Sequence, residues 1–99
     1  MFLAISQFTV ANGMQAKVRE AFEQRPHVVD SAKGFLRMEV ASPTDNEQDF
    51  WLLTWWAAEA DFQNWHHGHT YKDSHAGIPK GLKLDGKRTQ ISRLLVFAQ

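Results

Sequence analysis

Four of the five histidines lie within fifteen residues, Asp61 to His75, which also hold one of the four tryptophans. Imidazole is a common metal ligand and a general acid or base, so this run is where chemistry is first sought. His66 and His67 are adjacent, and on a helix their side chains diverge by about 100°, too far to share one metal ion. His66 and His69 have a spacing that suits zinc, but no third ligand is fixed beside them. Surface or rim polarity explains these three residues more simply.

His75 differs because of its surroundings. It follows Trp65 by ten residues, and on one continuous helix their side chains would stand about 80° apart, close enough to line one side of a cleft. An imidazole beside an indole suits a flat, apolar, anionic ligand. The cations that could meet its anionic groups are Lys80, Lys83, Lys87 and Arg88. A histidine near a helix end is more often a cap or a surface group, and spacing alone leaves both interpretations open. His27, near the end of the first predicted helix, is best explained as a surface residue.

Hydrophobic periodicity predicts the elements that position these residues. Strand composition and alternation occur in four segments, and helical spacing in two that lie between them. The predicted strands are 2–11, 35–40, 50–56 and 89–98, and the predicted helices are 14–25 and 57–67. The second helix can be interrupted at Gly68 and resume toward His75. This order indicates a single α+β domain, residues 1–99, with the ferredoxin-like βαββαβ fold and a four-stranded antiparallel sheet.

Three details of this pattern bear on packing. Leu36, Met38 and Val40 are predicted to share one face of their strand. The segment from Phe50 to Trp56 is apolar in both phases, which is typical of a strand buried on both sides. Two helices can cover only one face of the sheet, so the pattern predicts a homodimer that pairs sheet against sheet, a dimeric α+β barrel. A monomer with a partly apolar face is the alternative.

Composition narrows the classes of function. Lysine plus arginine and aspartate plus glutamate both number 11, so no net charge recruits nucleic acid or an anionic membrane. Cysteine is absent, which removes disulfides, iron–sulfur clusters and thiol nucleophiles. The amino-terminal segment lacks the features of a signal peptide, and no run reaches the roughly 20 apolar residues that cross a bilayer. We expect a soluble, cytoplasmic protein.

Longer motifs carry a resemblance to a known family. The run DFWLLTWWAAEADFQNWHHGHTYKDSH, with SQFTVANG and GFLRMEV upstream, resembles the IsdG-type heme-degrading monooxygenases of the antibiotic biosynthesis monooxygenase (ABM) superfamily. The family pattern is a strand ending in LT-x-W, a helix with F-x-x-W, and a histidine ten residues beyond that tryptophan. Here these are Leu53 to Trp56, Phe62 to Trp65, and His75. The histidine is the more specific element, because the first two motifs mark only the superfamily.

The resemblance implies roles for particular residues. His75 would be the axial ligand of heme iron, and Trp65 would press against the porphyrin and ruffle it. Phe8 and Phe22, with Val40, would line the cavity, although plain core packing is the favoured explanation for these three. A family asparagine of the first strand aligns with Ser6, a departure from the pattern.

Ser6 is in phase with Phe2, Ala4, Phe8 and Val10, so it should face the same apolar space, while Gln7 points away with Thr9. A serine hydroxyl can donate a hydrogen bond to bound oxygen but is shorter than an amide. Heme binding could therefore survive while turnover or product changed.

The resemblance thus implies an enzyme that binds heme, takes electrons from an external donor such as a reductase, activates O2, opens the porphyrin and releases iron. Three other functions stay open. One is a cofactor-free ABM monooxygenase of aromatic substrates that uses Trp65, Tyr71 and His75. The others are a heme-binding or small-ligand-binding module without turnover, and a purely structural dimer.

Overall fold

A computed structural model of the chain describes residues 1–25, 27–68 and 79–99. The elements are β1 (Phe2–Thr9), α1 (Gln15–Glu23), β2 (Phe35–Ala41), β3 (Asp49–Trp56), α2 (Glu59–His66) and β4 (Gln90–Leu95). Short 3-10 helices, η1 (Val28–Ser31) and η2 (Gly86–Arg88), follow α1 and precede β4. The predicted order of strands and helices is confirmed.

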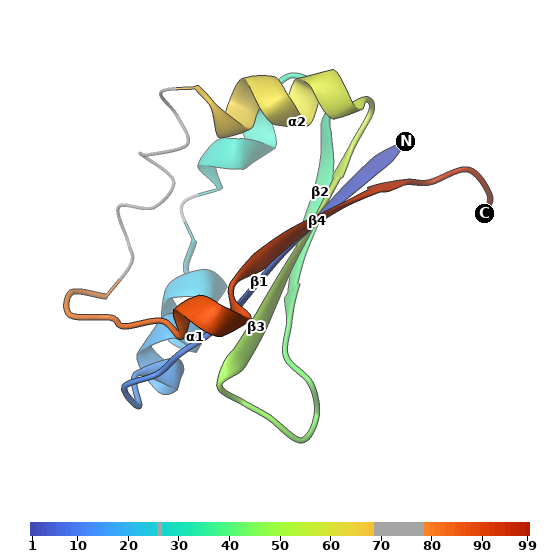
Figure 1. Cartoon of the computed structure of the whole chain (residues 1–99). Helices are drawn as coiled ribbons and strands as arrows, with labels where there is room; N and C mark the ends of the chain where they lie inside the picture. The colour runs from blue at the N-terminus through green and yellow to red at the C-terminus, as the bar shows by residue number, and fades with distance from the viewer. Residues whose placement is uncertain (26, 69–78) are drawn as a thin grey trace.

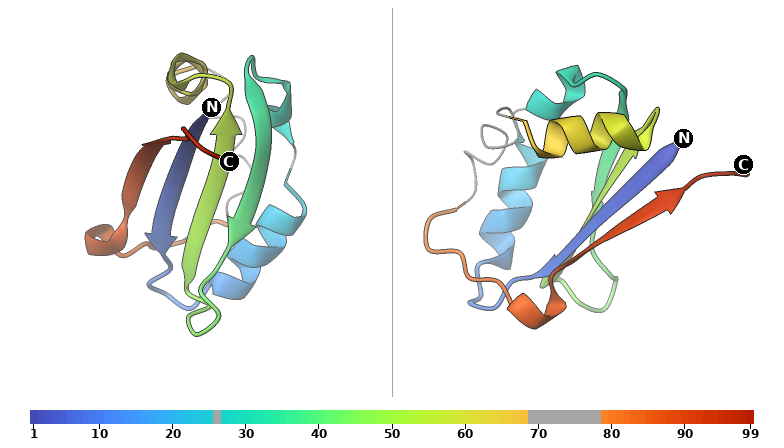
Figure 2. Two further views of the ribbon diagram at one scale, coloured as in Figure 1. Left: turned by 90° about the vertical axis from the view of Figure 1, so that its right-hand side faces the viewer. Right: turned by 45° about the horizontal axis from the view of Figure 1, so that its top comes forward.

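The sheet is antiparallel, with strand order β2-β3-β1-β4. Both α-helices lie on the same side of it, and the left view of Figure 2 shows the opposite face without a helix across it (Figures 1 and 2). This is the predicted ferredoxin-like βαββαβ architecture. No helix in the described part of the chain is long and apolar enough to cross a membrane.

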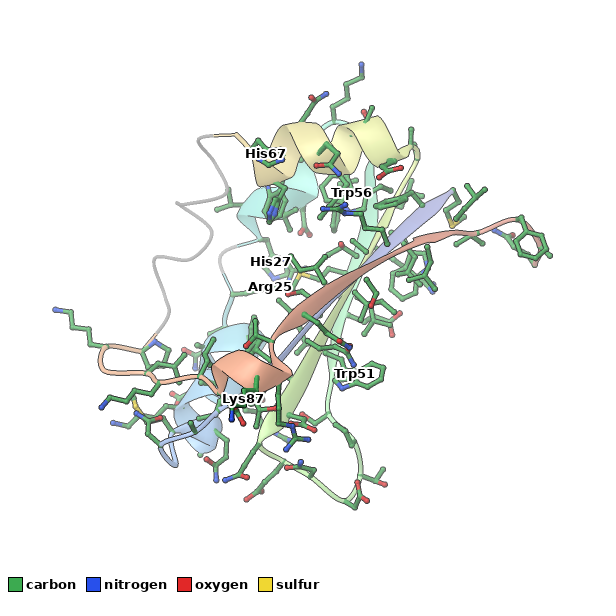
Figure 3. All side chains as sticks on the ribbon, viewed as in Figure 1. Arg25, His27, Trp51, Trp56, His67 and Lys87 are labelled. Carbon is green, nitrogen blue, oxygen red and sulfur yellow. The ribbon has the colours of Figure 1, made fainter. Side chains whose placement is uncertain are left out.

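Strand register decides which residues face the helices. Ala4 pairs with Thr54, Ser6 with Leu52, and Phe8 with Phe50, and directly paired residues share a face of the sheet. Trp56, which pairs with Phe2, lies on the helix side, whereas Trp51 lies on the other (Figure 3). Trp56 is fully buried, but Trp51 is 38% exposed. Within one chain, therefore, β3 is buried on one face only, and burial of its second face needs a partner.

A bulge near the start of β2 corrects one predicted face. Phe35 pairs with Trp56 and Arg37 with Trp55, so two residues of β2 advance against one of β3 and Leu36 is the extra residue. Leu36 is 50% exposed, while Phe35 packs against the core in its place. The prediction that Leu36 shares the buried face was wrong, because a bulge shifts the alternation of side chains by one.

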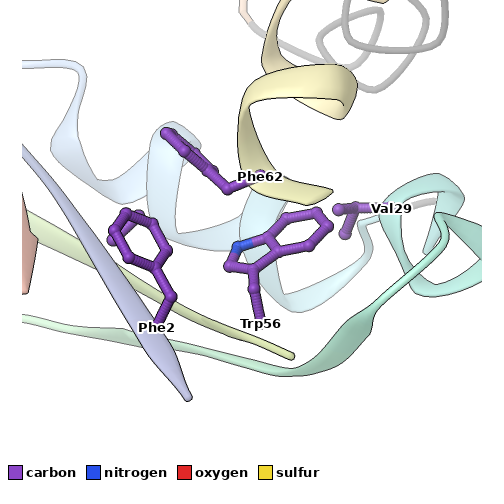
Figure 4. Close-up of a cluster of buried hydrophobic side chains, with 5 residues drawn as sticks. Phe2, Val29, Trp56 and Phe62 are labelled. Atoms are coloured by element: carbon purple, nitrogen blue, oxygen red, sulfur yellow. The ribbon is translucent and has the colours of Figure 1, made fainter. Parts of the chain in front are cut away.

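The core consists of two separate clusters on the helix side of the sheet. One lies under α2 and contains Phe2, Ala4, Val29, Trp56 and Phe62 (Figure 4). Trp56 meets Phe62 edge to face, with ring centroids 5.9 Å apart.

The second cluster lies against α1 and consists of Val10, Val18 and Phe50, with Phe8 and Phe22 packed on it. Val18 is the buried residue of α1, on the apolar side that an amphipathic helix turns toward the core. The middle of the sheet lies between the two clusters and holds the smaller side chains Ser6 and Thr54.

Candidate functional site

A cavity of about 290 Å³ lies between the two core clusters, bounded by the helix face of the sheet, α1, η1 and α2. The residues after Gly68 that the structure describes close another side, through Pro79, Leu82 and Leu84. Its described walls are almost wholly apolar and include no aspartate or glutamate. An apolar wall excludes water from the cavity. Hydrogen bonds inside it are stronger as a result, because the local dielectric constant is low.

Two hydroxyl groups face the cavity from the middle of the sheet, Ser6 on β1 and Thr54 on β3. The Thr54 hydroxyl accepts a hydrogen bond from Trp56 Nε1 at 2.9 Å, and it lies 3.5 Å from the carbonyl oxygen of Ala4. Ser6 faces the cavity as its strand phase predicts. Gln7 lies on the other face, where its side-chain oxygen accepts a hydrogen bond from Gln90.

The aromatic residues singled out from the sequence surround the same cavity. Trp65 approaches it from α2, Phe22 from α1 and Phe8 from β1. Trp65 packs on Trp56, with centroids 5.8 Å apart, and Phe8 lies 6.2 Å from Phe22. Phe8 and Phe22 also pack on the second core cluster, so they serve the core and the cavity wall together. Val40 does not line the cavity; it lines an open groove between α1 and the β2–β3 connection.

The predicted relation between Trp65 and His75 is described only as far as the end of α2. Helix α2 ends at His66, with a turn at His67 and Gly68, close to the predicted end at residue 67. Glycine has a low helical propensity, which suits its place just beyond this helix end. His69, Tyr71 and His75 lie outside the described residues, and their predicted roles stay predictions.

Arg25 and His27 also line the cavity, a position that the sequence did not predict for either. The prediction that His27 is a surface residue is confirmed, because its side chain is 62% exposed. The two residues lie together between α1 and α2 (Figure 3). Arg25 Nη1 donates to Asp30 Oδ1 at 2.8 Å, and His27 Nδ1 lies 3.2 Å from Asp30 Oδ2. The hydrogen bond from the Arg25 guanidinium holds the pKa of Asp30 below its usual range. Burial of the carboxyl group opposes this shift, and the contact with His27 adds to it. The i, i+3 spacing of His27 and Asp30 is the sequence feature from which their contact could have been predicted.

The predicted cations lie elsewhere. Lys80, Lys83, Lys87 and Arg88 are exposed and are absent from the cavity wall. Arg88 instead donates to Asp49 Oδ2 at 3.3 Å, and the Thr9 hydroxyl donates to Asp49 Oδ1. These contacts tie the segment before β4 to the ends of β1 and β3.

Comparison with known proteins bears on this cavity. A family model described as antibiotic biosynthesis monooxygenase matches residues 1–77. A heme oxygenase (staphylobilin-producing) of Staphylococcus haemolyticus is 31% identical over 82 residues, which cover 81% of this chain and 78% of the relative. A heme oxygenase (mycobilin-producing) of Mycobacterium tuberculosis is 29% identical over 73 residues, covering 74% and 69%.

Solved structures share the fold over the whole chain. The heme-degrader MhuD of Mycobacterium tuberculosis, with two hemes bound in its active site, has a TM-score of 0.80 at 23% identity, with 100% of this chain and 98% of that chain covered. SnoaB, a cofactor-independent oxygenase of Streptomyces nogalater, has a TM-score of 0.76 at 13% identity, with 99% and 94% covered. At these identities the likeness concerns the fold, which serves oxygenases with and without a cofactor.

Proposed function

The chain belongs to the antibiotic biosynthesis monooxygenase family, and we propose that it is a monooxygenase that binds heme and opens the porphyrin oxidatively, with O2 and an external electron donor. The relatives named heme oxygenases, at 29–31% identity, support this specialisation. One structural observation carries it further: Ser6, Phe22 and Trp65, from three different elements, surround one apolar cavity.

The described walls fit a porphyrin chemically. Its faces are flat and apolar, and they match a cavity walled by aromatic and aliphatic side chains with no carboxylate in the described lining. Trp65, backed by Trp56 at 5.8 Å, offers a rigid aromatic surface. Bound heme supplies the iron at which O2 is activated, so the protein's part is ligation, shape and polarity.

Each named residue then has a physical task. His75 would hold the iron through a neutral imidazole nitrogen, a role that the family motif supports. Trp65 would press on the porphyrin, because the buried Trp56 behind it resists displacement. Ser6 would donate a hydrogen bond from its hydroxyl to an oxygen atom bound inside the cavity. Phe8 and Phe22 keep water out.

A hemin titration tests the proposal. We expect a Soret band specific to the complex, and its loss or displacement in His75→Ala, because the axial ligand is gone. Complexed protein supplied with ascorbate and O2, with catalase present to remove free peroxide, should lose the Soret band and release iron. Absence of a specific band in the wild-type protein would rule out heme as the ligand, and a stable band under turnover conditions would leave a heme-binding protein without activity.

A cofactor-free oxygenase is the second candidate. The cavity, at about 290 Å³, is at the low end of ligand sites and suits a smaller aromatic substrate, and the fold of SnoaB is shared. O2 consumption with an aromatic substrate by protein free of heme and metal, unaffected by added hemin, would favour this candidate.

The proposed function also involves partners. A reductase would supply electrons, and we propose a homodimer that covers the outer face of the sheet, where Trp51 is 38% exposed and Leu94 is 42% exposed.

A further inference from the structure

Two side-chain hydroxyl groups interrupt the apolar wall of the cavity at the middle of the sheet. Ser6 on β1 and Thr54 on β3 are both half-buried. Their neighbours on the same face of the two strands are apolar and include Ala4, Phe8 and Leu52. A hydroxyl group in such a wall has lost much of its hydrogen bonding with water, so a ligand atom that replaces the lost bonds is bound preferentially.

The register of the sheet places these hydroxyl groups beside each other. Ser6 pairs with Leu52 and Thr54 with Ala4, which makes Ser6 and Thr54 diagonal neighbours on one face of adjacent strands. The Cβ atoms of such neighbours are about 7 Å apart or less. An oxygen atom at hydrogen-bonding distance from both can join hydroxyl oxygens that are up to roughly 5.5 Å apart. One acceptor atom can therefore contact Ser6 and Thr54 at the same time.

The contacts of Thr54 make its hydroxyl group a donor toward the cavity. A hydroxyl group has one proton and two lone pairs. Trp56 Nε1 donates to Thr54 Oγ1 at 2.9 Å, so a fully buried indole occupies one lone pair. The carbonyl oxygen of Ala4 lies 3.5 Å from Thr54 Oγ1, well beyond the usual length of about 2.7–2.8 Å for an O–H···O bond. A closer acceptor in the cavity would therefore take this proton.

The Ser6 hydroxyl group is the second donor. Within the described part of the chain it has no hydrogen-bond partner. The neighbouring polar side chain, Gln7, accepts its hydrogen bond from Gln90 on the opposite face of the sheet. Both hydroxyl protons are thus available to one ligand atom from the same side of the cavity.

We propose that Ser6 and Thr54 form a subsite for a single hydrogen-bond-accepting oxygen atom. The cavity then selects a flat apolar ligand that has such an oxygen, for example a ketone, over a hydrocarbon of the same shape. The inference goes beyond the proposed function, which gives a polar role to Ser6 alone, because it concerns what the cavity recognises with or without heme. It assigns Thr54 a contact with the ligand in addition to its contact with Trp56.

The test compares a ketone with a hydrocarbon of the same shape. 2-Acetylnaphthalene and 2-isopropenylnaphthalene share a flat two-ring body and differ in one group, C=O or C=CH2. Equilibrium dialysis gives the dissociation constant of each probe, and the ratio of the two constants is the ketone preference. Thr54→Val removes the donor and keeps the shape. We expect the ketone preference to fall about fivefold from its wild-type value, with hydrocarbon affinity unchanged.

The matched control is Thr89→Val. Thr89 also lines the cavity, but its hydroxyl group donates to the Asp85 carbonyl oxygen at 3.1 Å. The same substitution there should leave the ketone preference unchanged, and Thr54→Ser, which retains the hydroxyl group, should keep most of it. An unchanged preference in Thr54→Val, an equal fall in Thr89→Val, or failure of the wild-type protein to bind either probe would overturn the proposal.

Ser6→Ala tests the second hydroxyl group. Thr54→Val also deprives the Trp56 indole of its acceptor, whereas Ser6→Ala leaves that contact in place and so does not depend on the stability of the other variant. We expect the ketone preference to fall severalfold while the folded fraction, followed by circular dichroism, stays at the wild-type value. A preference that does not change in Ser6→Ala would show that the two hydroxyl groups do not share one oxygen atom, and it would overturn the subsite.

Hemin binding separates this inference from the proposed function. A ketone preference that depends on Thr54, in a protein that does not bind hemin, would support the subsite and refute the proposed function. Hemin binding by a protein whose ketone preference is the same in the wild type and in Thr54→Val would refute the subsite alone.

Discussion

At the scale of single residues, the cavity depends on a few polar groups placed among aromatic ones. Ser6 and Thr54 are the hydroxyl-bearing residues that β1 and β3 contribute to its wall. The Thr54 hydroxyl is engaged by the Trp56 indole, which leaves Ser6 as the group whose replacement changes the cavity with least effect on the core.

Thr54→Val should therefore destabilise the fold. Trp56 is fully buried, and its Nε1 donates to the Thr54 hydroxyl at 2.9 Å. Valine keeps the shape but leaves the indole N–H without this acceptor, at a cost of about 1–3 kcal/mol in the free energy of unfolding. Thr54→Ser keeps the hydroxyl and should cost clearly less. Urea denaturation measures both variants, and equal losses in the two would mean that the hydrogen bond is not what stabilises this position.

Ser6→Asn and Ser6→Ala should move heme turnover in opposite directions. A longer amide donor reaches farther into the cavity than a hydroxyl, whereas alanine removes the donor. We expect a change of about tenfold each way in the single-turnover rate of Soret loss, the equivalent of one hydrogen bond made or lost. Hemin affinity, measured alongside, should change little. Identical rates in both variants would remove Ser6 from the mechanism.

The residues of the site were predictable to different degrees for physical reasons. The facing of Ser6 and Phe8 follows from the two-residue period of a strand, which the sequence displays directly. The positions of Arg25 and His27 depend on the path of the chain between α1 and η1 and on the contact with Asp30. A left-handed φ of 58° at His27 has no reliable sequence signal, so neither residue was expected at the cavity.

At the scale of elements, turns and irregularities set where side chains go. The order of strands and helices followed from hydrophobic period, and so did the end of α2 to within a residue, but the bulge at Leu36 and the left-handed turn at His27 did not. Both features depend on which group forms a hydrogen bond with each backbone N–H and C=O. The hydrophobic period of the sequence contains no information on these partners. Gly34 lies just before β2 at a φ of 78°, a backbone conformation that glycine adopts readily.

Gly34→Ala and Gly13→Ala should differ in their cost. Both glycines have positive φ, 78° and 76°, so alanine at either position is strained by about 1–2 kcal/mol. A Cβ at Gly13 meets open space, whereas one at Gly34 would lie 2.7 Å from the Asp61 Cβ of α2 and closer still to its carboxylate. Gly34→Ala should therefore lower the free energy of unfolding by more. Thermal unfolding compares the two variants. An equal loss of stability would mean that the Asp61 side chain of α2 moves away from the new Cβ at little cost.

The contact between Arg25 and Asp30 also joins the end of α1 to η1, and it predicts a pH dependence. The folded state lowers the pKa of Asp30, chiefly through its hydrogen bond with Arg25, so the contact stabilises the fold above the ordinary aspartate pKa of 3.8 that applies in the unfolded chain. This contribution is lost as pH falls through the lower folded pKa. Because the Asp30 side chain is 41% exposed, it amounts to at most about 1 kcal/mol.

Urea denaturation across this range should show wild type exceeding Asp30→Asn in stability at pH 6 and approaching it at the acid end. A constant difference at every pH would attribute the effect of the substitution to something other than the ion pair.

At the scale of the whole molecule, the uncovered face of the sheet is the feature that one chain does not explain. Leu3 pairs with Trp55 and Leu94, and Ile5 pairs with Leu53, so apolar side chains run across β3, β1 and β4 on the side away from the helices. Monomeric proteins rarely leave such a contiguous patch in water. The partner that we propose is a second copy of the same face, because such a face is self-complementary. This pairing would complete the predicted burial of β3 on both sides.

Trp51→Glu should weaken the proposed dimer. The indole lies on the outer face of β3 and is 38% exposed in the single chain, and a tryptophan at an interface commonly contributes 2 kcal/mol or more, or about thirtyfold in the dissociation constant. Ala16→Glu introduces the same charge at an exposed position on α1 and should leave association unchanged. Sedimentation velocity over a range of concentrations measures both variants. A wild-type protein that stays monomeric, or equal weakening by the two substitutions, would contradict pairing through the sheet. The cavity lies on the other side of β1 and β3. The hemin affinity of monomeric Trp51→Glu therefore reports whether pairing of the sheets is needed to keep Ser6 and Thr54 in place.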